Sequence, residues 1–92
     1  MVMETLATFY AAATPRTGTE DVFEKCIRQL ADRETVDGVR FSILEVTPAS
    51  AALRGEMPLS ECPECPEALA TYLEDQLVSR EGIYLNLDVN IA

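Results

Sequence analysis

The Cys62-Pro63-Glu64-Cys65 segment holds the residues whose types and spacing could support chemistry. Two thiols separated by two residues can bind one metal ion or close one small disulfide. The segment lies just before a predicted helix, whose positive N-terminal end stabilises a thiolate. Three carboxylates around the pair oppose thiolate formation through their negative charge, and these are Glu61, Glu64 and Glu67.

Two cysteines supply only half of a structural zinc site, because such a site takes four protein ligands. The other ligands would have to come from the same pair in a second copy, or from Cys26 and a carboxylate. Cys26 lies on the apolar stripe of a predicted helix, a position typical of a small buried hydrophobe. Three roles of Cys62 and Cys65 therefore stay open: zinc ligands, a redox pair, or turn and cap residues in a proline-rich connection.

The lack of histidine removes most enzyme templates from consideration. Without it, Ser-His-Asp triads, Cys-His dyads and His-containing zinc sites cannot form. The sequence also contains no phosphate-binding loop, dinucleotide-binding or nucleophile-elbow motif. The only lysine, Lys25, falls on the charged side of its predicted helix, where a buried catalytic amine would not lie. We therefore expect a non-enzymatic protein.

The acidic charge balance limits the partners. Sixteen Asp and Glu against seven Lys and Arg give a net charge of -9. Binding to a phosphate backbone needs clusters of Lys or Arg, which this sequence lacks, so nucleic acid is not an expected partner. The acidic residues concentrate in the second half of the chain, which we expect to face water or a basic protein partner.

The length of 92 residues predicts a single domain over residues 1–92. So small a chain buries a limited fraction of its surface, so pairing with a second copy would stabilise it. Neither a secretory signal nor an apolar run of about 20 residues is visible, so we expect a cytoplasmic protein without a membrane partner.

The first third of the chain predicts a strand followed by a helix. Residues that favour strands run from Met3 to Ala11 and end at Thr14-Pro15. Thr17 and Glu20 have the spacing of a capping box, with Thr19 as an alternative N-cap. The apolar stripe of the helix comprises Val22, Phe23, Cys26, Ile27, Leu30 and Ala31.

The middle of the chain predicts one clear strand and one ambiguous segment. The helix should end before Asp37-Gly38. Residues 39–46 alternate in polarity and then switch phase at Leu44, which indicates a strand with a bulge or a fully buried end. Residues 49–57 fit a short edge strand, a helical turn or a packed loop, and we favour the strand.

The last third predicts a helix and the most regular strand. The helix begins near Pro66, a residue suited to a first helical position, and Gly82 is its predicted C-cap. From Ile83 to Ile91 apolar and polar residues alternate, which is typical of a strand with one wet face. Its polar row, which could form a ligand site, a dimer interface or a solvated face, is Tyr84, Asn86, Asp88 and Asn90. We expect Phe9, Tyr10, Phe41 and Tyr72 to pack in the core.

Together these elements follow the order βαβ(β)αβ. A strand with one wet face belongs to an antiparallel or mixed sheet whose other face is covered by helices. With right-handed crossovers, this order predicts an α+β, ferredoxin-like split βαβ sandwich. Two helices would then lie on one face of a three- or four-stranded, mostly antiparallel sheet.

Residues 4–47 combine three features. A predicted strand ends at Thr14-Pro15, a predicted helix contains Val22, Ile27 and Leu30, and the segment Val36-Asp37-Gly38-Val39 leads into a second strand. This arrangement resembles the opening of small acidic uncharacterised haloarchaeal proteins, some of them labelled helix-turn-helix domains. One lysine against six arginines, with many carboxylates, is likewise similar to halophilic proteins. The resemblance implies a haloarchaeal source and, through the label, a nucleic-acid-binding regulator. The second half of the chain has no pair of adjacent helices with a recognition face, which argues against that role.

Three functional hypotheses follow. The first is a non-enzymatic interaction or regulatory module that forms a homodimer through its open sheet face or an edge strand, indifferent to chelators and thiol reagents. The alternative is a thiol-dependent protein that uses Cys62 and Cys65 for zinc binding or redox. The third, a nucleic-acid-binding regulator, predicts DNA association that survives high salt.

Overall fold

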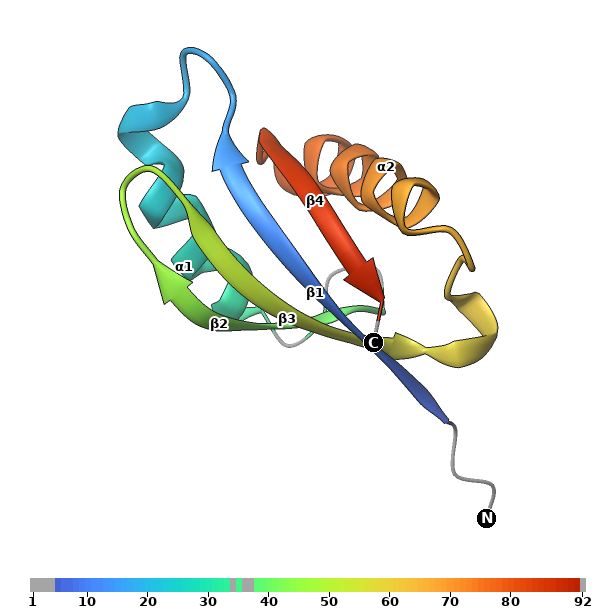
Figure 1. The fold of residues 1–92 in the computed structure, drawn as a ribbon. Helices are drawn as coiled ribbons and strands as arrows, with labels where there is room; N and C mark the ends of the chain where they lie inside the picture. Colours follow the sequence, from blue (N-terminus) through green and yellow to red (C-terminus); the bar gives the residue numbers. More distant parts are fainter. Residues whose placement is uncertain (1–4, 34, 36–37, 92) are drawn as a thin grey trace.

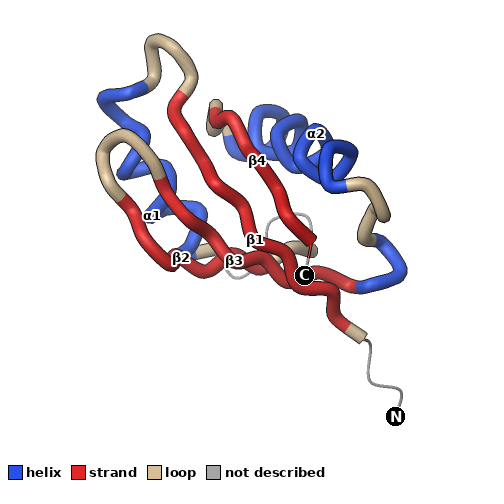
Figure 2. The backbone as a smooth tube through the Cα atoms, in the orientation of Figure 1, coloured by secondary structure: helices blue, strands red, loops and turns tan. Residues whose placement is uncertain are grey.

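Residues 5–33, 35 and 38–91 of the chain are described by a computed structural model. Parts of two predicted features lie outside them: the start of the first strand at Met3, and Val36 and Asp37 in the loop after the first helix. The described residues form one sheet with two α-helices and short helical turns (Figure 1, Figure 2). The elements are β1 (Leu6–Pro15), α1 (Phe23–Asp32), β2 (Arg40–Val46), β3 (Ala51–Pro58), α2 (Pro66–Gln76) and β4 (Leu85–Ile91).

The sheet has the strand order β2-β3-β1-β4, and every neighbouring pair is antiparallel. In Figure 1, α1 lies behind β2 and β3, and α2 lies beside β4. The α+β class predicted from the sequence is therefore confirmed, and the arrangement is compatible with a ferredoxin-like fold.

The central strand β1 alternates strictly between the core and the outside. Its inward positions are buried beneath the helices, while the positions between them face away from the core. The described strand begins at Leu6 and ends at Pro15, in agreement with the predicted end at Thr14-Pro15. Three of its four buried residues are alanines, which give a weak hydrophobic signal, and the four are Ala7, Phe9, Ala11 and Ala13.

The ambiguous segment after Pro48 is the strand β3, as favoured, but it is not an edge strand. It lies between β2 and β1 and pairs with both. Small residues occupy two of its inward positions, Ala51 and Gly55, and this obscured its central place. The bulge expected near Leu44 is confirmed by a register shift between Ile43 and Glu45.

Helix α1 begins without the expected capping box. A 3-10 turn, Glu20–Val22, precedes it, and Thr19 makes no side-chain cap hydrogen bond. The Thr19 hydroxyl instead donates to the carbonyl of Arg16 at 2.8 Å. Because Val22 lies in that turn, it is exposed, and its expected place on the buried stripe is wrong. The buried face of the helix consists of Phe23, Ile27 and Leu30.

Helix α2 begins at Pro66 as predicted and continues into a π-helical turn, Leu77–Glu81. Gly82 then adopts the left-handed conformation with φ 65°, which confirms it as the C-cap. The expected core position of Tyr72 is wrong, because this side chain is 39% exposed and Ala70 takes the inward place. No helix among the residues described in this structure is long and apolar enough to cross a membrane.

Candidate functional site

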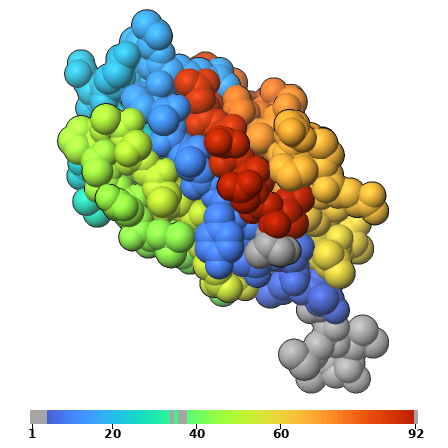
Figure 3. Space-filling view, viewed as in Figure 1, coloured from blue at the N-terminus to red at the C-terminus, as the bar shows by residue number. Residues whose placement is uncertain are grey.

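No described residue covers the side of the sheet that faces away from both helices, and we call this side the open face. Figure 3 shows the strands at the surface of the molecule on this side. Because side chains alternate along each strand, the residues between the buried positions form this face. They are Leu6, Thr8, Tyr10, Ala12 and Thr14 on β1, Ala52, Arg54 and Glu56 on β3, Asn86, Asp88 and Asn90 on β4, and Arg40, Ser42 and Glu45 on β2, which lie opposite the three β3 residues.

Tyr10 lies at the centre of the open face. It is in register with Arg54 on β3 and with Asn90 on β4. The next residue on this side of β1 is Ala12, whose cross-strand neighbours are Ala52 and Asp88. The Tyr10 ring is 44% exposed, which makes its expected core position wrong. Its neighbour Phe9 takes the core position, because adjacent residues of a strand point to opposite faces.

Charges lie on both sides of this aromatic centre. On β3, Arg54 Nη1 contacts Glu56 Oε1 at 2.9 Å. On β4, Asp88 is exposed and forms no ion pair with the residues that the structure describes. The open face therefore has a small apolar centre and a polar rim, the composition found in many protein interfaces.

The predicted polar row is divided between two places. Asn86, Asp88 and Asn90 are exposed on β4 and contribute to the open face, as the alternation indicated. Tyr84 lies before the strand begins, with the Arg16 guanidinium 6.0 Å from the centre of its ring. The sequence reasoning missed Tyr10, although the strand alternation that places Phe9 inward also places Tyr10 outward.

The two cysteines flank a bend just before α2, and both are free thiols. Cys62 is partly buried and lines a groove of about 530 Å³ together with Leu6, Leu59 and Ile91. Cys65 is the exposed N-cap residue of α2, and its thiol donates a hydrogen bond to Glu67 Oε2 at 2.7 Å. The Glu67 carboxylate accepts this hydrogen bond and a second one from the backbone N–H of Glu67. Both bonds lower the pKa of Glu67 below the ordinary value of 4.5.

Metal ligands do not gather in the described part of the chain: no three His, Cys, Asp or Glu side chains are arranged there to hold a metal ion. Cys26 is partly buried and packs against the core. The arrangement in which two copies each supply Cys62 and Cys65 needs a second chain and stays a prediction.

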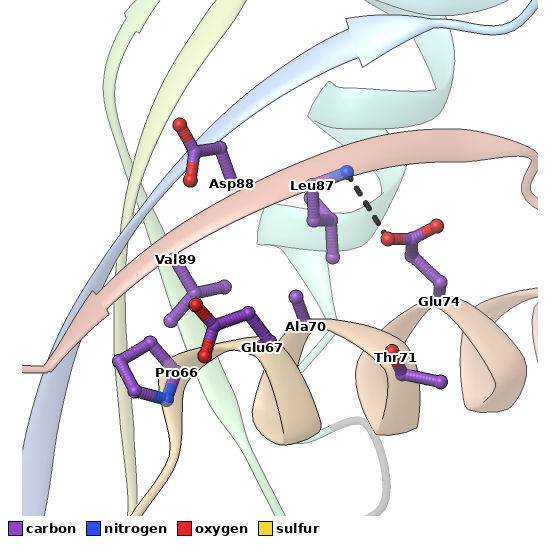
Figure 4. Close-up of a pocket in the computed structure, with 8 residues that line it drawn as sticks. All are labelled: Pro66, Glu67, Ala70, Thr71, Glu74, Leu87, Asp88 and Val89. Carbon is purple, nitrogen blue, oxygen red and sulfur yellow. Dashed lines mark hydrogen bonds between the residues drawn. The ribbon is translucent and has the colours of Figure 1, made fainter.

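A second groove, of about 250 Å³, lies between α2 and β4 (Figure 4). The helix contributes Glu67, Ala70, Thr71 and Glu74 to its lining, and the strand contributes residues 87–89. Across it, the backbone N–H of Leu87 donates to Glu74 Oε2 at 3.4 Å.

These features define a class, an α+β protein with an open sheet face and grooves at its surface, without defining a family. No protein-family model, curated protein or solved structure matches the chain.

Proposed function

We propose that this chain is a small non-enzymatic interaction module of the ferredoxin-like fold, which forms a homodimer through the open face of its sheet. The observation that carries the proposal is the Tyr10 ring, exposed at the centre of an uncovered sheet and surrounded by small and polar side chains. Aromatic side chains in such central positions supply much of the binding energy of protein interfaces.

The size of the open face supports a reversible dimer. Strands of at least seven residues rise about 3.3 Å per residue, and four strands about 4.8 Å apart are about 19 Å wide. Each copy therefore offers roughly 500 Å², and two copies would bury roughly 1,000 Å². This area lies at the lower end of specific protein interfaces, so we expect an affinity weaker than that of an obligate dimer.

The distribution of charge favours one arrangement of the two copies. A two-fold axis between the faces, parallel to β1, places β3 of one copy over β4 of the other. Tyr10 is in register with both Arg54 and Asn90, so Arg54 would lie over the partner's Asn90 and beside the partner's Asp88. Opposite charges then meet twice, once on each side of the paired Tyr10 rings.

The acidity of the chain gives this dimer a characteristic response to salt. Two copies of net charge -9 repel each other at low ionic strength. Salt screens this repulsion, because the Debye length falls from about 10 Å at 0.1 M to about 3 Å at 1 M. We therefore place the module in a concentrated-salt cytoplasm, in keeping with its halophilic composition, and expect the dimer to strengthen as salt increases.

Sedimentation velocity tests the proposal. It is measured at protein concentrations between about 10 µM and 500 µM, each in about 0.1 M and about 1 M salt. The wild-type chain should dimerise with increasing concentration, and Tyr10→Glu should stay monomeric because it places two like charges at the centre. Tyr72→Glu is the matched control, since Tyr72 is similarly exposed but lies on α2. A wild-type chain that stays monomeric throughout, or equal loss in both variants, contradicts the proposal.

A second candidate function, a thiol-dependent protein, is favoured by one observation. Both thiols of the CxxC segment are free, and Cys65 is exposed at the N-terminal end of α2. Zinc shared between two copies, or a dithiol and disulfide cycle, would use Cys62 and Cys65 directly. Replacement of both cysteines with serine separates this candidate from the first.

A further inference from the structure

β4 is an edge strand, because among the described strands it has a neighbour, β1, on one side only. In an antiparallel strand, the N–H and C=O groups of successive residues point alternately to the two sides. The N–H of Leu87 points outward, since it reaches Glu74 on α2. The same alternation directs the backbone groups of Leu85, Val89 and Ile91 outward.

Side chains cover only the first part of this edge. Arg16 Nε donates to the carbonyl of Leu85 at 3.1 Å, and its Nη2 pairs with Glu74 at 3.3 Å. Glu74 in turn accepts from Leu87. Beyond that residue, no hydrogen bond from the described part of the chain reaches the outward backbone groups of Val89 and Ile91.

The uncovered part of the edge faces the groove beside α2. Figure 4 shows Glu67, Ala70 and Thr71 on the helix below the strand, with Asp88 on the other side of the strand. Because α2 lies beside β4 in Figure 1, a strand added at the outer edge of β4 would pack against this helix.

Charge identifies the kind of segment that fits there. The groove is lined by the carboxylates of Glu67, Glu74 and Asp88, and by no basic side chain. Glu74 is paired with Arg16, whereas Glu67 accepts from a thiol and Asp88 forms no ion pair among the described residues. A second β4 edge would bring like charges together at Asp88, which disfavours self-pairing here.

We propose that the β4 edge from Leu87 to Ile91, together with the facing side of α2, accepts an extended basic peptide from another protein as a fifth strand. The backbone groups of Val89 and Ile91 bind the peptide main chain, as in other complexes formed by strand addition. Side chains of the added strand alternate in direction, so one set lies beside Asp88 and the other points to Glu67 and Thr71. Adjacent Lys or Arg residues therefore fit best, one for each carboxylate.

Amide hydrogen exchange tests where the peptide binds. The probe is an eight-residue peptide of Val and Thr around two adjacent lysines, and its counterpart has glutamates in their place. The lysine peptide should slow exchange at the N–H groups of Val89 and Ile91. Those of Asp88 and Asn90, which pair with β1, should not change. Binding without this pattern, or binding of both peptides alike, overturns the proposal.

A charge reversal with a matched control tests what the groove recognises. Glu67→Lys should weaken the lysine peptide by roughly three- to tenfold, whereas Asp75→Lys should change it less than twofold. Asp75 is exposed on the same helix and does not line the groove. Equal weakening would mean attraction to net charge alone and would contradict the proposal. The two proposals share Asp88 but have separate readouts, because sedimentation reports the open face and amide exchange reports the edge.

Discussion

The phenyl ring of Phe9 lies over Gly55, its partner across the β1 and β3 pair. A side-chain carbon on Gly55 would overlap this ring. Gly55 also stands opposite Phe41 on β2, and the two phenyl rings meet edge to face with centroids 6.0 Å apart. The glycine is therefore needed for space, since it lets two aromatic rings pack over the middle of the sheet.

Gly55→Ala should lower the free energy of unfolding by about 1–3 kcal/mol, the usual cost of overpacking a core. Urea unfolding monitored by circular dichroism measures it. The control is the same substitution in a Phe9→Ala background, where the ring is gone and the added methyl group should cost much less. Additive effects of the two substitutions would show that the ring is not what requires the glycine.

The Arg16 and Glu74 pair protects the start of the β4 edge, because the two side chains bind outward backbone groups of Leu85 and Leu87. Glu74→Ala should speed hydrogen exchange at the Leu87 amide and lower stability by about 0.5–1.5 kcal/mol. The lower part of that range is expected, since the paired side chains are 37% and 26% exposed.

Two further variants test whether the hydrogen bond from Leu87 to Glu74 causes the slow exchange. Glu74→Gln keeps an oxygen that can accept from Leu87 and should therefore retain the slow exchange. Glu24→Ala removes the more exposed Glu24 and Arg28 pair on α1, with side chains 40% and 59% exposed, and should cost at most about 0.5 kcal/mol. Fast exchange at Leu87 in Glu74→Gln would assign the protection to the ion pair instead of to the hydrogen bond.

The local pattern of the sequence was sufficient for much of this fold. Strict alternation predicted the strand β4, the phase switch at Leu44 predicted the bulge in β2, and Pro66 and Gly82 marked the two ends of the α2 region. These features depend on backbone geometry within a few residues, which local sequence determines.

The arrangement between strands was harder to predict. The central place of β3 depends on its pairing with β1, which joins residues 38 apart (Ala13 with Ala51) to 52 apart (Leu6 with Pro58) in the sequence. In addition, Ala and Gly give little hydrophobic signal. The open face needs the same long-range register, since Arg54, Tyr10 and Asn90 come from three strands. The groove between α2 and β4 is also hard to predict from local sequence, because it forms only when a helix packs beside a strand.

The hydrogen bond from Cys65 to Glu67 predicts a dependence on pH. Because the pKa of Glu67 in the folded chain lies below 4.5, the ionised carboxylate stabilises the fold at pH values above 4.5. This contribution is lost as the pH falls from 4.5 through the lower, folded value. In Cys65→Ala the NMR titration midpoint of the Glu67 carboxylate should move upward, since its main cause of depression is removed. Cys62→Ala, which leaves the bond intact, is the control, and an equal shift in both variants would contradict the assignment.

Replacement of both cysteines distinguishes the interaction module from the thiol-dependent protein. We expect Cys62→Ser with Cys65→Ser to leave the dimer and its metal content unchanged, because the Cys65 thiol is bound by a carboxylate of its own chain. Native mass spectrometry of freshly purified protein, never exposed to chelator, reports both quantities in one spectrum. A wild-type dimer that carries one zinc ion, absent from the double variant, would instead assign the four cysteines of two copies to a shared site. A metal-free wild-type dimer that persists in the variant supports the open face as the interface.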